Sequence, residues 1–357
     1  MTAAARNPLR RAALTIVAMA LVAAGGAGVR ALQADGIFAS VTPGFAGRCE
    51  SVALSGVSDI AIDAKEKTAF LAVLDARRPG SGDGIYALNM GGTDAPVRLA
   101  GTPKDFHPRG LSLWRAPDGG LFLAAVNARA GGRASVDSFT LARKDGAWTL
   151  SPQGTVMGGL LADPQDVVLV GPTNFYVSNG TTARNGAMRW LQMHGVLPGG
   201  NIAYFNGTIL REVVNGIYGP RGLALTADGG HLLAASLTGR MLLSLNRESF
   251  TGNLSEGENL DLPAAPDKVV LDQAGNAWVA GHARLSSWRA FAGDSGVRPP
   301  SQIFKVTIQG GVPKAAEQIY GDDGRAIAGA EAGAAFGERL LMGSPLDGKL
   351  LDCETRK

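Results

Sequence analysis

Short apolar runs that alternate with tight-turn sequences make up most of this chain. The clearest example is residues 163–177, where a polar pair leads into an apolar run, a Gly-Pro turn and a second apolar run. Strand-forming residues on both sides of a turn signal predict a β-hairpin. The same pattern returns in five segments, at 56–73, 108–126, 220–235, 266–279 and, more weakly, 331–342. We therefore predict an all-β chain.

A polar pair begins each of these segments, and the pairs reveal a repeat. Their first members recur at intervals of 46 to 64 residues. A period near or above about 50 residues, with several strands per unit, is typical of propeller blades with insertions. The pairs are Ser58-Asp59, Arg109-Gly110, Gln165-Asp166, Arg221-Gly222, Asp267-Lys268 and Glu331-Ala332. We predict a six-bladed β-propeller in which these pairs begin the innermost strands and surround the mouth of an axial channel.

The first 30 residues have the pattern of a targeting segment. Residues 12–29 are uncharged and follow Arg10 and Arg11. This pattern suits a signal peptide and also a short membrane anchor, and it predicts that the chain after it is exported. Cleavage and anchoring both stay open, because the small residues at 23–28 offer no sharp cleavage site. We assign 1–30 to this segment, 31–48 to a linker and 49–357 to the propeller.

Two cysteines, Cys49 and Cys353, bracket the repeat array. In an oxidising compartment two such residues would pair, and a bridge between the first and last strands would close the ring of blades. Two unrelated thiols are the alternative. We predict the disulfide, because the cysteines lie at the two ends of the array.

The charge distribution argues against nucleic acid as a partner. The net charge is +3, but four arginines and no acidic residue lie in the first 30 positions, so residues 31–357 sum to −1. The propeller therefore has no basic face for nucleic acid. The four histidines lie in different units without metal-ligand spacing, which also argues against a zinc site.

Two insertions, at 179–200 and 281–300, interrupt the strand pattern. The first contains a segment rich in Met and Trp at 187–194, which predicts a helix. Long insertions between strands often serve a function. Two interpretations of this helix stay open: it packs on the rim of the propeller, or it forms a lid over the channel.

Several stretches, taken in order, resemble the serum paraoxonase/arylesterase family of six-bladed propellers. The resemblance covers roughly residues 32–353 and includes the apolar N-terminus and the end-to-end cysteine pair. Its matching stretches are Phe106–Ser112, Val126-Asn127, Val170–Tyr176, Val279–His282 and Gly348–Cys353. Gluconolactonase/senescence-marker propellers share the same architecture. The resemblance implies hydrolysis of lactones and aryl esters by a calcium ion at the channel mouth, and a second, deeper structural calcium.

For the deeper ion, the resemblance implies Asp59, Asp166 and the main-chain carbonyl of Leu111 as ligands. Both carboxylates are present in this sequence. Two like charges that converge on a propeller axis would repel each other without a cation, which favours metal binding. The alternative is that each carboxylate caps nearby backbone amides. We therefore expect one structural calcium ion.

The positions implied for the catalytic ion differ from the family pattern. Ser58 replaces a glutamate ligand, and Gln165, Arg221 and Lys268 replace asparagine ligands; Asp267 alone matches. Arginine and lysine carry positive charge and have donors only, so they cannot coordinate calcium and would repel it.

The implied proton-shuttling pair is also missing. Its histidine position holds Arg109 and its second position holds Ala128, although His282 matches a family histidine that lines the pocket. We therefore expect calcium-dependent hydrolysis by the family mechanism to be absent.

Two functional hypotheses follow from this replacement. In the first, the protein is a non-catalytic exported propeller that binds a small anionic or carbonyl-bearing ligand. Arg109, Arg221 and Lys268 supply the positive charge of the missing metal, and Asp267 and Glu331 neutralise part of it. The same side chains could instead form an internal salt-bridge network that plugs the channel.

In the second hypothesis, the protein is a divergent ester or lactone hydrolase. Arginine and lysine would stabilise the oxyanion, and His282 or Asp267 would activate water. This hypothesis ranks second because Ser58 lacks an evident base and the ring shows no activated nucleophile.

Overall fold

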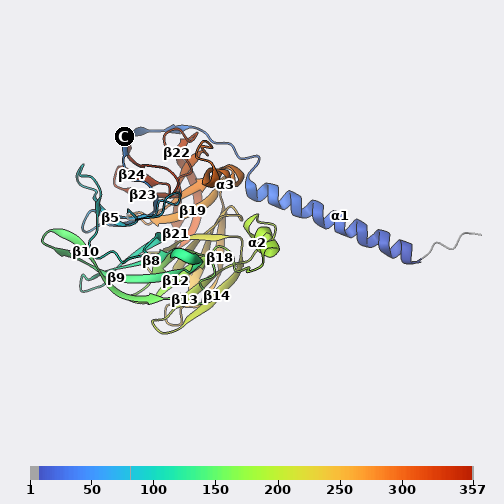
Figure 1. Cartoon of the computed structure of the whole chain (residues 1–357), viewed down its shortest axis with the longest axis horizontal. Coiled ribbons are helices and arrows are strands. Elements are labelled where there is room, and N and C mark those ends of the chain that lie inside the picture. The colour runs from blue at the N-terminus through green and yellow to red at the C-terminus, as the bar shows by residue number, and fades with distance from the viewer. Residues whose placement is uncertain (1–7, 81, 356–357) are drawn as a thin grey trace, which may run out of the picture.

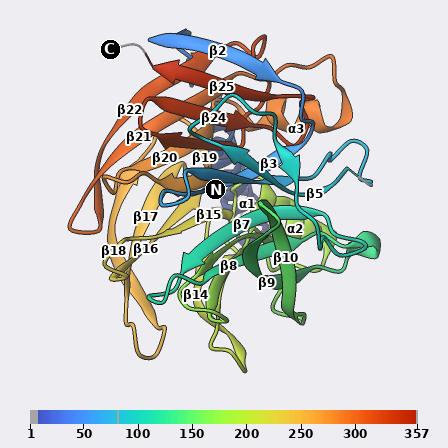
Figure 2. The ribbon, with the colours of Figure 1, turned by 90° about the vertical axis from the view of Figure 1, so that its left-hand side faces the viewer.

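Antiparallel sheets arranged around a central axis form the body of the protein (Figure 2). The computed structural model describes residues 8–80 and 82–355. Six sheets are present in this part of the chain, so the predicted six-bladed β-propeller is confirmed. Each sheet is one blade, and each blade starts with its innermost strand at the polar pair identified above.

The first three blades follow one another in the sequence, and each contains four strands. Blade one consists of β3 (Val57–Asp63), β4 (Thr68–Val73), β5 (Gly84–Asn89) and β6 (Val97–Arg98). Blade two consists of β7 (Pro108–Arg115), β8 (Leu121–Asn127), β9 (Ser135–Lys144) and β10 (Ala147–Val156), with the 3-10 turn η1 (Ala130–Gly132) between β8 and β9. Blade three consists of β11 (Pro164–Leu169), β12 (Phe175–Asn179), β13 (Gly200–Phe205) and β14 (Leu210–Ile217).

Of the last three blades, blades five and six each include a strand from the N-terminal side of the array. Blade four consists of β15 (Pro220–Leu225), β16 (His231–Ser236), β17 (Met241–Arg247) and β18 (Leu254–Asp261). Blade five consists of β19 (Ala265–Leu271), β20 (Ala277–His282), β21 (Ser301–Gln309) and β22 (Val312–Asp322), with β1 (Gly44–Phe45) at its edge. Blade six consists of β23 (Ala332–Phe336), β24 (Arg339–Gly343), β25 (Leu350–Thr355) and β2 (Gly47–Val52).

The ring is closed within blade six by a strand from each end of the array. Strand β2 pairs with β25 so that Cys49 lies opposite Cys353, and the two form a disulfide. The predicted bridge is therefore confirmed. The region 31–48, assigned to a linker from sequence, contains the C-terminal end of the N-terminal helix, a loop, the short strand β1 and the start of β2.

Apolar side chains fill the spaces between neighbouring blades rather than the interior of any one blade. Phe70, Leu123 and Phe139, for example, are fully buried in the cluster that joins blades one and two. Burial of one such side chain contributes about 1.5–3 kcal/mol. Because a single blade leaves these faces exposed, the blades depend on stacking against their neighbours.

The innermost strands approach one another closely around the axis. A Cβ atom on Gly110 would lie 2.6 Å from Asp166 Oδ1, and one on Gly222 would lie 2.6 Å from the Asp267 carbonyl oxygen. No larger residue fits at either position without a shift of the neighbouring inner strand. This close approach explains why glycine follows Arg109 and Arg221 in their polar pairs.

A long apolar helix, α1 (Pro8–Asp35), projects away from the propeller (Figure 1). It is long and apolar enough to cross a membrane, a property that signal sequences share. Its last turn contacts the body: Asp35 Oδ1 accepts a hydrogen bond from Ser286 N at 2.6 Å, and Arg30 Nη2 donates to the Thr238 carbonyl at 2.9 Å.

The two insertions form the short helices α2 (Gly186–Met193) and α3 (Leu285–Gly293), so the predicted helical insertions are confirmed. Asn185 caps α2, because its side chain accepts a hydrogen bond from Met188 N at 2.7 Å. Arg289 Nη2 of α3 donates to the Met193 carbonyl of α2 at 2.6 Å. The insertions therefore contact each other, on the side of the propeller where α1 ends (Figure 1).

Candidate functional site

The polar pairs come together at the start of the inner strands, and two arginines converge there on one oxygen. Arg221 Nη1 lies 2.5 Å from Gln165 Oε1, and Arg109 Nη1 lies 3.4 Å from the same oxygen. The three residues begin the adjacent strands β7, β11 and β15. A neutral amide is therefore the hydrogen-bond acceptor shared by two guanidinium groups.

Acids lie near these two arginines, but among the described residues none forms an ion pair with either of them. No carboxylate oxygen of residues 8–80 or 82–355 lies within 4.0 Å of either guanidinium. Burial lowers the pKa of Arg109, and the positive charge of Arg221 lowers it further, whereas Asp163, Glu331 and Asp267 act in the opposite direction. Both side chains are half-buried. The mouth of the channel therefore carries concentrated positive charge.

Helix α3 contributes an aromatic wall to this mouth. The Arg221 guanidinium lies over the ring of Trp288, 5.3 Å from its centre. Trp288 Nε1 also donates to Glu331 Oε1 at 3.2 Å. Burial raises the pKa of Glu331 to about 8, with a further contribution from the negative charge of Asp267, whereas Arg221 and Arg109 act against the shift. Glu331 is therefore mostly protonated at neutral pH.

A buried histidine–aspartate pair lies behind Trp288. His282 Nε2 is 3.1 Å from Asp267 Oδ2, and the His282 and Trp288 rings are 4.8 Å apart. Burial alone would raise the pKa of Asp267, but Arg221 and the bond to His282 lower it below its usual value. Among the described residues, Asp267 Oδ1 and His282 Nδ1 have no hydrogen-bond partner. Each of the two groups thus keeps one free polar atom.

The surroundings of Ser58 indicate that it holds neighbouring strands together. Its hydroxyl lies 3.1 Å from the Ala72 carbonyl and 2.9 Å from the Pro108 carbonyl, and its side chain is buried. These contacts connect blades one and two. No base lies among them, so the position gives no support for a nucleophile.

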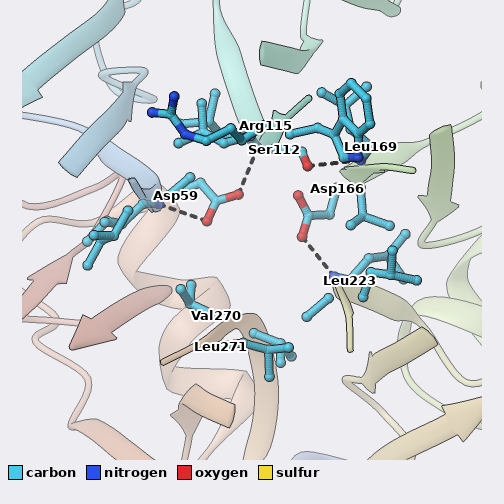
Figure 3. Close-up of a pocket in the computed structure, with 18 residues that line it drawn as sticks. Asp59, Ser112, Arg115, Asp166, Leu169, Leu223, Val270 and Leu271 are labelled. Atoms are coloured by element: carbon cyan, nitrogen blue, oxygen red, sulfur yellow. Dashed lines mark hydrogen bonds between the residues drawn. The ribbon is translucent and has the colours of Figure 1, made fainter. Parts of the chain in front are cut away.

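Asp59 and Asp166 face each other deeper in the channel, beside a cavity of about 280 Å³ (Figure 3). Each carboxylate accepts two backbone hydrogen bonds, one from its own strand and one from the next blade. Asp59 accepts from Ile60 N and Leu111 N, both at 2.8 Å. Asp166 accepts from Val167 N at 2.9 Å and Leu223 N at 2.8 Å. The backbone capping considered from sequence is thus present.

Lys268, which was expected from sequence to lie with the arginines of the mouth, extends instead into this deeper site. Its Nζ atom donates to the Gln165 carbonyl at 2.7 Å and lies 3.3 Å from Asp166 Oδ1 and 3.5 Å from Asp59 Oδ2. Lys268 as a whole residue is 2% exposed to solvent. A calcium ion bound to the same carboxylates would lie against this ammonium group and be repelled by it.

The residues present therefore do not fit the structural calcium ion that the family resemblance implies. Within the described ranges, no group of three or more His, Cys, Asp or Glu residues could hold a metal ion. The calcium ion stays a prediction of the resemblance, and Lys268 argues against it.

Trp288 is the site residue that sequence reasoning did not single out. It comes from an insertion and not from the repeat, so its register relative to the ring could not be read from the polar pairs. The only signal was the Trp and Arg content of residues 281–300.

Comparison with known proteins identifies a family. The family model described as Arylesterase matches residues 66–355. Serum paraoxonase/arylesterase 1 of Homo sapiens is 24% identical over 251 residues, which cover 70% of this chain and 68% of that protein. Serum paraoxonase/arylesterase 2 of Gallus gallus is 23% identical over 250 residues, covering 70% and 69%. Mechanosensory abnormality protein 6 of Caenorhabditis elegans is 22% identical over 255 residues, covering 70% and 66%.

Solved structures resemble this chain in fold. A luciferin-regenerating enzyme aligns with a TM-score of 0.51 and 13% identity, covering 86% of this chain and 95% of that one. A gluconolactonase from Xanthomonas campestris aligns with a TM-score of 0.51 and 13% identity, covering 89% and 96%. At this identity the likeness supports the propeller architecture alone.

Proposed function

Because this chain belongs to the arylesterase family, we propose that it is an exported member whose channel mouth binds a small anionic ligand without a catalytic metal ion. The observation that carries the proposal is the pair Arg109 and Arg221, which share the oxygen of Gln165 and lack a carboxylate partner among the described residues. Arginine binds carboxylates and phosphates through forked donors. A ligand carboxylate at this position would relieve the repulsion between the two guanidinium groups.

The internal salt-bridge plug considered from sequence is less well supported. Lys268 does pair with Asp59 and Asp166. A plug at the mouth also requires the acids of the ring to pair with Arg109 and Arg221. Asp267 instead contacts His282, and Glu331 accepts from Trp288. Glu331 is also mostly uncharged at neutral pH, because burial raises its pKa to about 8.

Export is supported by two features of the chain. The apolar helix α1 resembles a signal sequence or membrane anchor, and the Cys49–Cys353 disulfide is typical of an oxidising compartment. In the proposal, the propeller lies outside the cytoplasm, either anchored by α1 or released from it.

Binding can be tested on the purified full chain with simple probes. We expect sodium benzoate to raise the melting temperature in a concentration-dependent way, because a ligand that binds only the folded state stabilises it. Benzamide, its neutral analogue, should have no such effect. Arg109→Gln and Arg221→Gln should abolish the benzoate shift.

Arg325→Gln is the matched control for these variants, since Arg325 is highly exposed and pairs only locally with Asp323. It should keep the response of the wild type. The proposed anion site would be refuted if benzoate raised the melting temperature equally in the wild type and the three variants. It would also be refuted if benzoate, acetate and inorganic phosphate all left the melting temperature of the wild type unchanged.

A second candidate function is divergent ester or lactone hydrolysis, favoured by the Asp267–His282 pair. The free Nδ1 of His282 could accept a proton from water, and Arg221 could stabilise the oxyanion. Both pair members are only 1% exposed, which limits access of water and places this candidate second.

The two candidates differ in their activity with phenyl acetate and γ-butyrolactone, measured with and without EDTA. Turnover that persists in EDTA and is lost in both His282→Ala and Arg221→Ala would establish the hydrolase. Absence of turnover together with benzoate binding would support the binding protein. Turnover that requires calcium would contradict both.

A further inference from the structure

The position of Lys268 suggests a role that is separate from ligand binding at the mouth. Its ammonium group lies among three oxygens that come from two different blades: Asp59 Oδ2 of blade one, and Asp166 Oδ1 and the Gln165 carbonyl of blade three. Lys268 itself belongs to blade five. The side chain therefore crosses the axis and joins strands from three parts of the ring.

Hydrogen bonds extend this arrangement to the remaining blades. Leu111 N of blade two donates to Asp59, and Leu223 N of blade four donates to Asp166, each at 2.8 Å. Lys268 N donates to the Glu331 carbonyl, just before the inner strand of blade six, at 3.1 Å. One ammonium group and two carboxylates therefore connect blades one to five, and the backbone of Lys268 connects them to blade six.

We propose that the Lys268 ammonium is the permanent cation at the centre of this propeller, and that the ring folds and stays folded without a divalent metal ion. It takes the place of the structural calcium expected from the family. Unlike an ion, the ammonium group is covalently attached and cannot dissociate when calcium is scarce.

Charge and coordination both support this assignment. Calcium requires six to eight oxygen ligands at 2.3–2.6 Å. At this site, four backbone N–H groups already bind the two carboxylates, and Nζ lies between them. Burial would lower the pKa of Lys268, but Asp166 and Asp59 raise it above its usual value. Burial also raises the pKa of Asp59 and Asp166, and the positive charge of Lys268 opposes that shift.

The first test uses the wild-type full chain. We expect metal analysis after purification in calcium-containing buffer to find far less than one calcium ion per chain. The melting temperature should be the same in EDTA and in CaCl2. A stoichiometric calcium ion, or a melting temperature that falls on chelation, would overturn the proposal whether or not any variant folds.

The second test replaces the lysine. Lys268→Met keeps the length of the side chain and removes its charge, which leaves two buried carboxylates without a cation. We expect the melting temperature to fall by about 5 to 10 °C. Lys268→Asn also removes the charge, but its shorter side chain leaves space for a calcium ion and offers a neutral oxygen as a ligand. CaCl2 should therefore raise the melting temperature of this variant, and EDTA should reverse that rise.

Lys314→Asn is the control, because Lys314 is exposed and pairs only with the exposed Glu258. Its melting temperature should equal that of the wild type and should not change when CaCl2 is added. Lys268→Met with wild-type stability would show that the ammonium is not the central cation. These outcomes are independent of benzoate binding, so failure of the anion site would leave this inference intact.

Discussion

The channel holds positive charge at two depths, and the two regions differ in the groups that surround this charge. In the deep region, Lys268 is 2% exposed and has two carboxylates and a carbonyl oxygen around it. At the mouth, Arg109 and Arg221 are half-buried and share one neutral amide oxygen. A cation whose charge is matched within the fold stabilises the ring, whereas cations without such a match are suited to bind an anion from outside.

This contrast gives a general criterion for divergent members of a metal-dependent family. Loss of metal ligands does not by itself show whether a site has become structural or has changed its ligand. The partners of the replacing side chains decide between these outcomes. In our proposals for this protein, replacement by Lys268 serves the structure and replacement by Arg221 serves anion binding.

The largest effect should come from breaking the deep region. Asp166→Ala removes a partner of Lys268 and the acceptor of Leu223 N and Val167 N, so we expect a loss of about 3–5 kcal/mol in the free energy of unfolding. Chemical denaturation followed by circular dichroism would measure it. Asp261→Ala, at an exposed position of β18, is the control and should change little. A loss similar to that of the control would remove the distinction between the two regions.

An intermediate effect should come from Glu331, whose carbonyl binds Lys268 and whose side chain lies at the mouth. Its folded-state pKa of about 8 exceeds its ordinary value of 4.5, because burial and Asp267 raise it more than Arg221, Arg109 and Lys268 lower it. The folded state therefore binds more protons between these values. Its contribution to stability is complete below about pH 4.5 and is lost as the pH rises through about 8.

Glu331→Gln should remove this dependence, because glutamine does not titrate and can still accept from Trp288. Relative to the wild type, we expect the variant to gain at least about 1.4 kcal/mol between pH 5 and pH 9, the equivalent of one pKa unit. Urea denaturation of both proteins at the two pH values would measure it. Parallel pH profiles would show that Glu331 is ionised throughout.

The smallest effect on stability should come from the mouth itself. Arg109→Gln removes a charge that Arg221 repels, and no carboxylate partner in the described chain is left behind. We expect a change within about 1 kcal/mol, in the stabilising direction. Thermal unfolding without added anion would measure it, and a loss as large as that of Asp166→Ala would mean that the mouth is also a structural network.

The sequence was sufficient for the fold because the relevant signals are local and repeated. Hairpin patterns beginning at Ser58, Arg109, Gln165, Arg221, Asp267 and Glu331 identified the inner strand of each blade, and the cysteines indicated the closure. The same register placed most of the ring residues in one region. Repeats of this kind fix the position of a backbone segment around the axis.

The depth that each side chain reaches was not inferred from the pairs. Lys268 is the second member of its pair, the place that Asp59 and Asp166 hold in theirs, and it reaches those carboxylates. Arg221 is a first member and stays at the mouth. The distinction depends on which neighbours accept the charge, and for Lys268 those neighbours include Gln165, which is 103 positions away in the sequence, and Asp59, which is farther still. The position of Trp288 could not be predicted for a related reason, since an insertion has no register with the repeat.

Blade six has a consequence for the order of events during synthesis. It combines β2, which is made early, with β23, β24 and β25, which are made last. Five sheets can assemble on a growing polypeptide, but the circle stays open until residue 355 has left the ribosome. Any interruption of translation before that point would leave the first and fifth blades with uncovered apolar faces, which marks such products for aggregation or proteolysis.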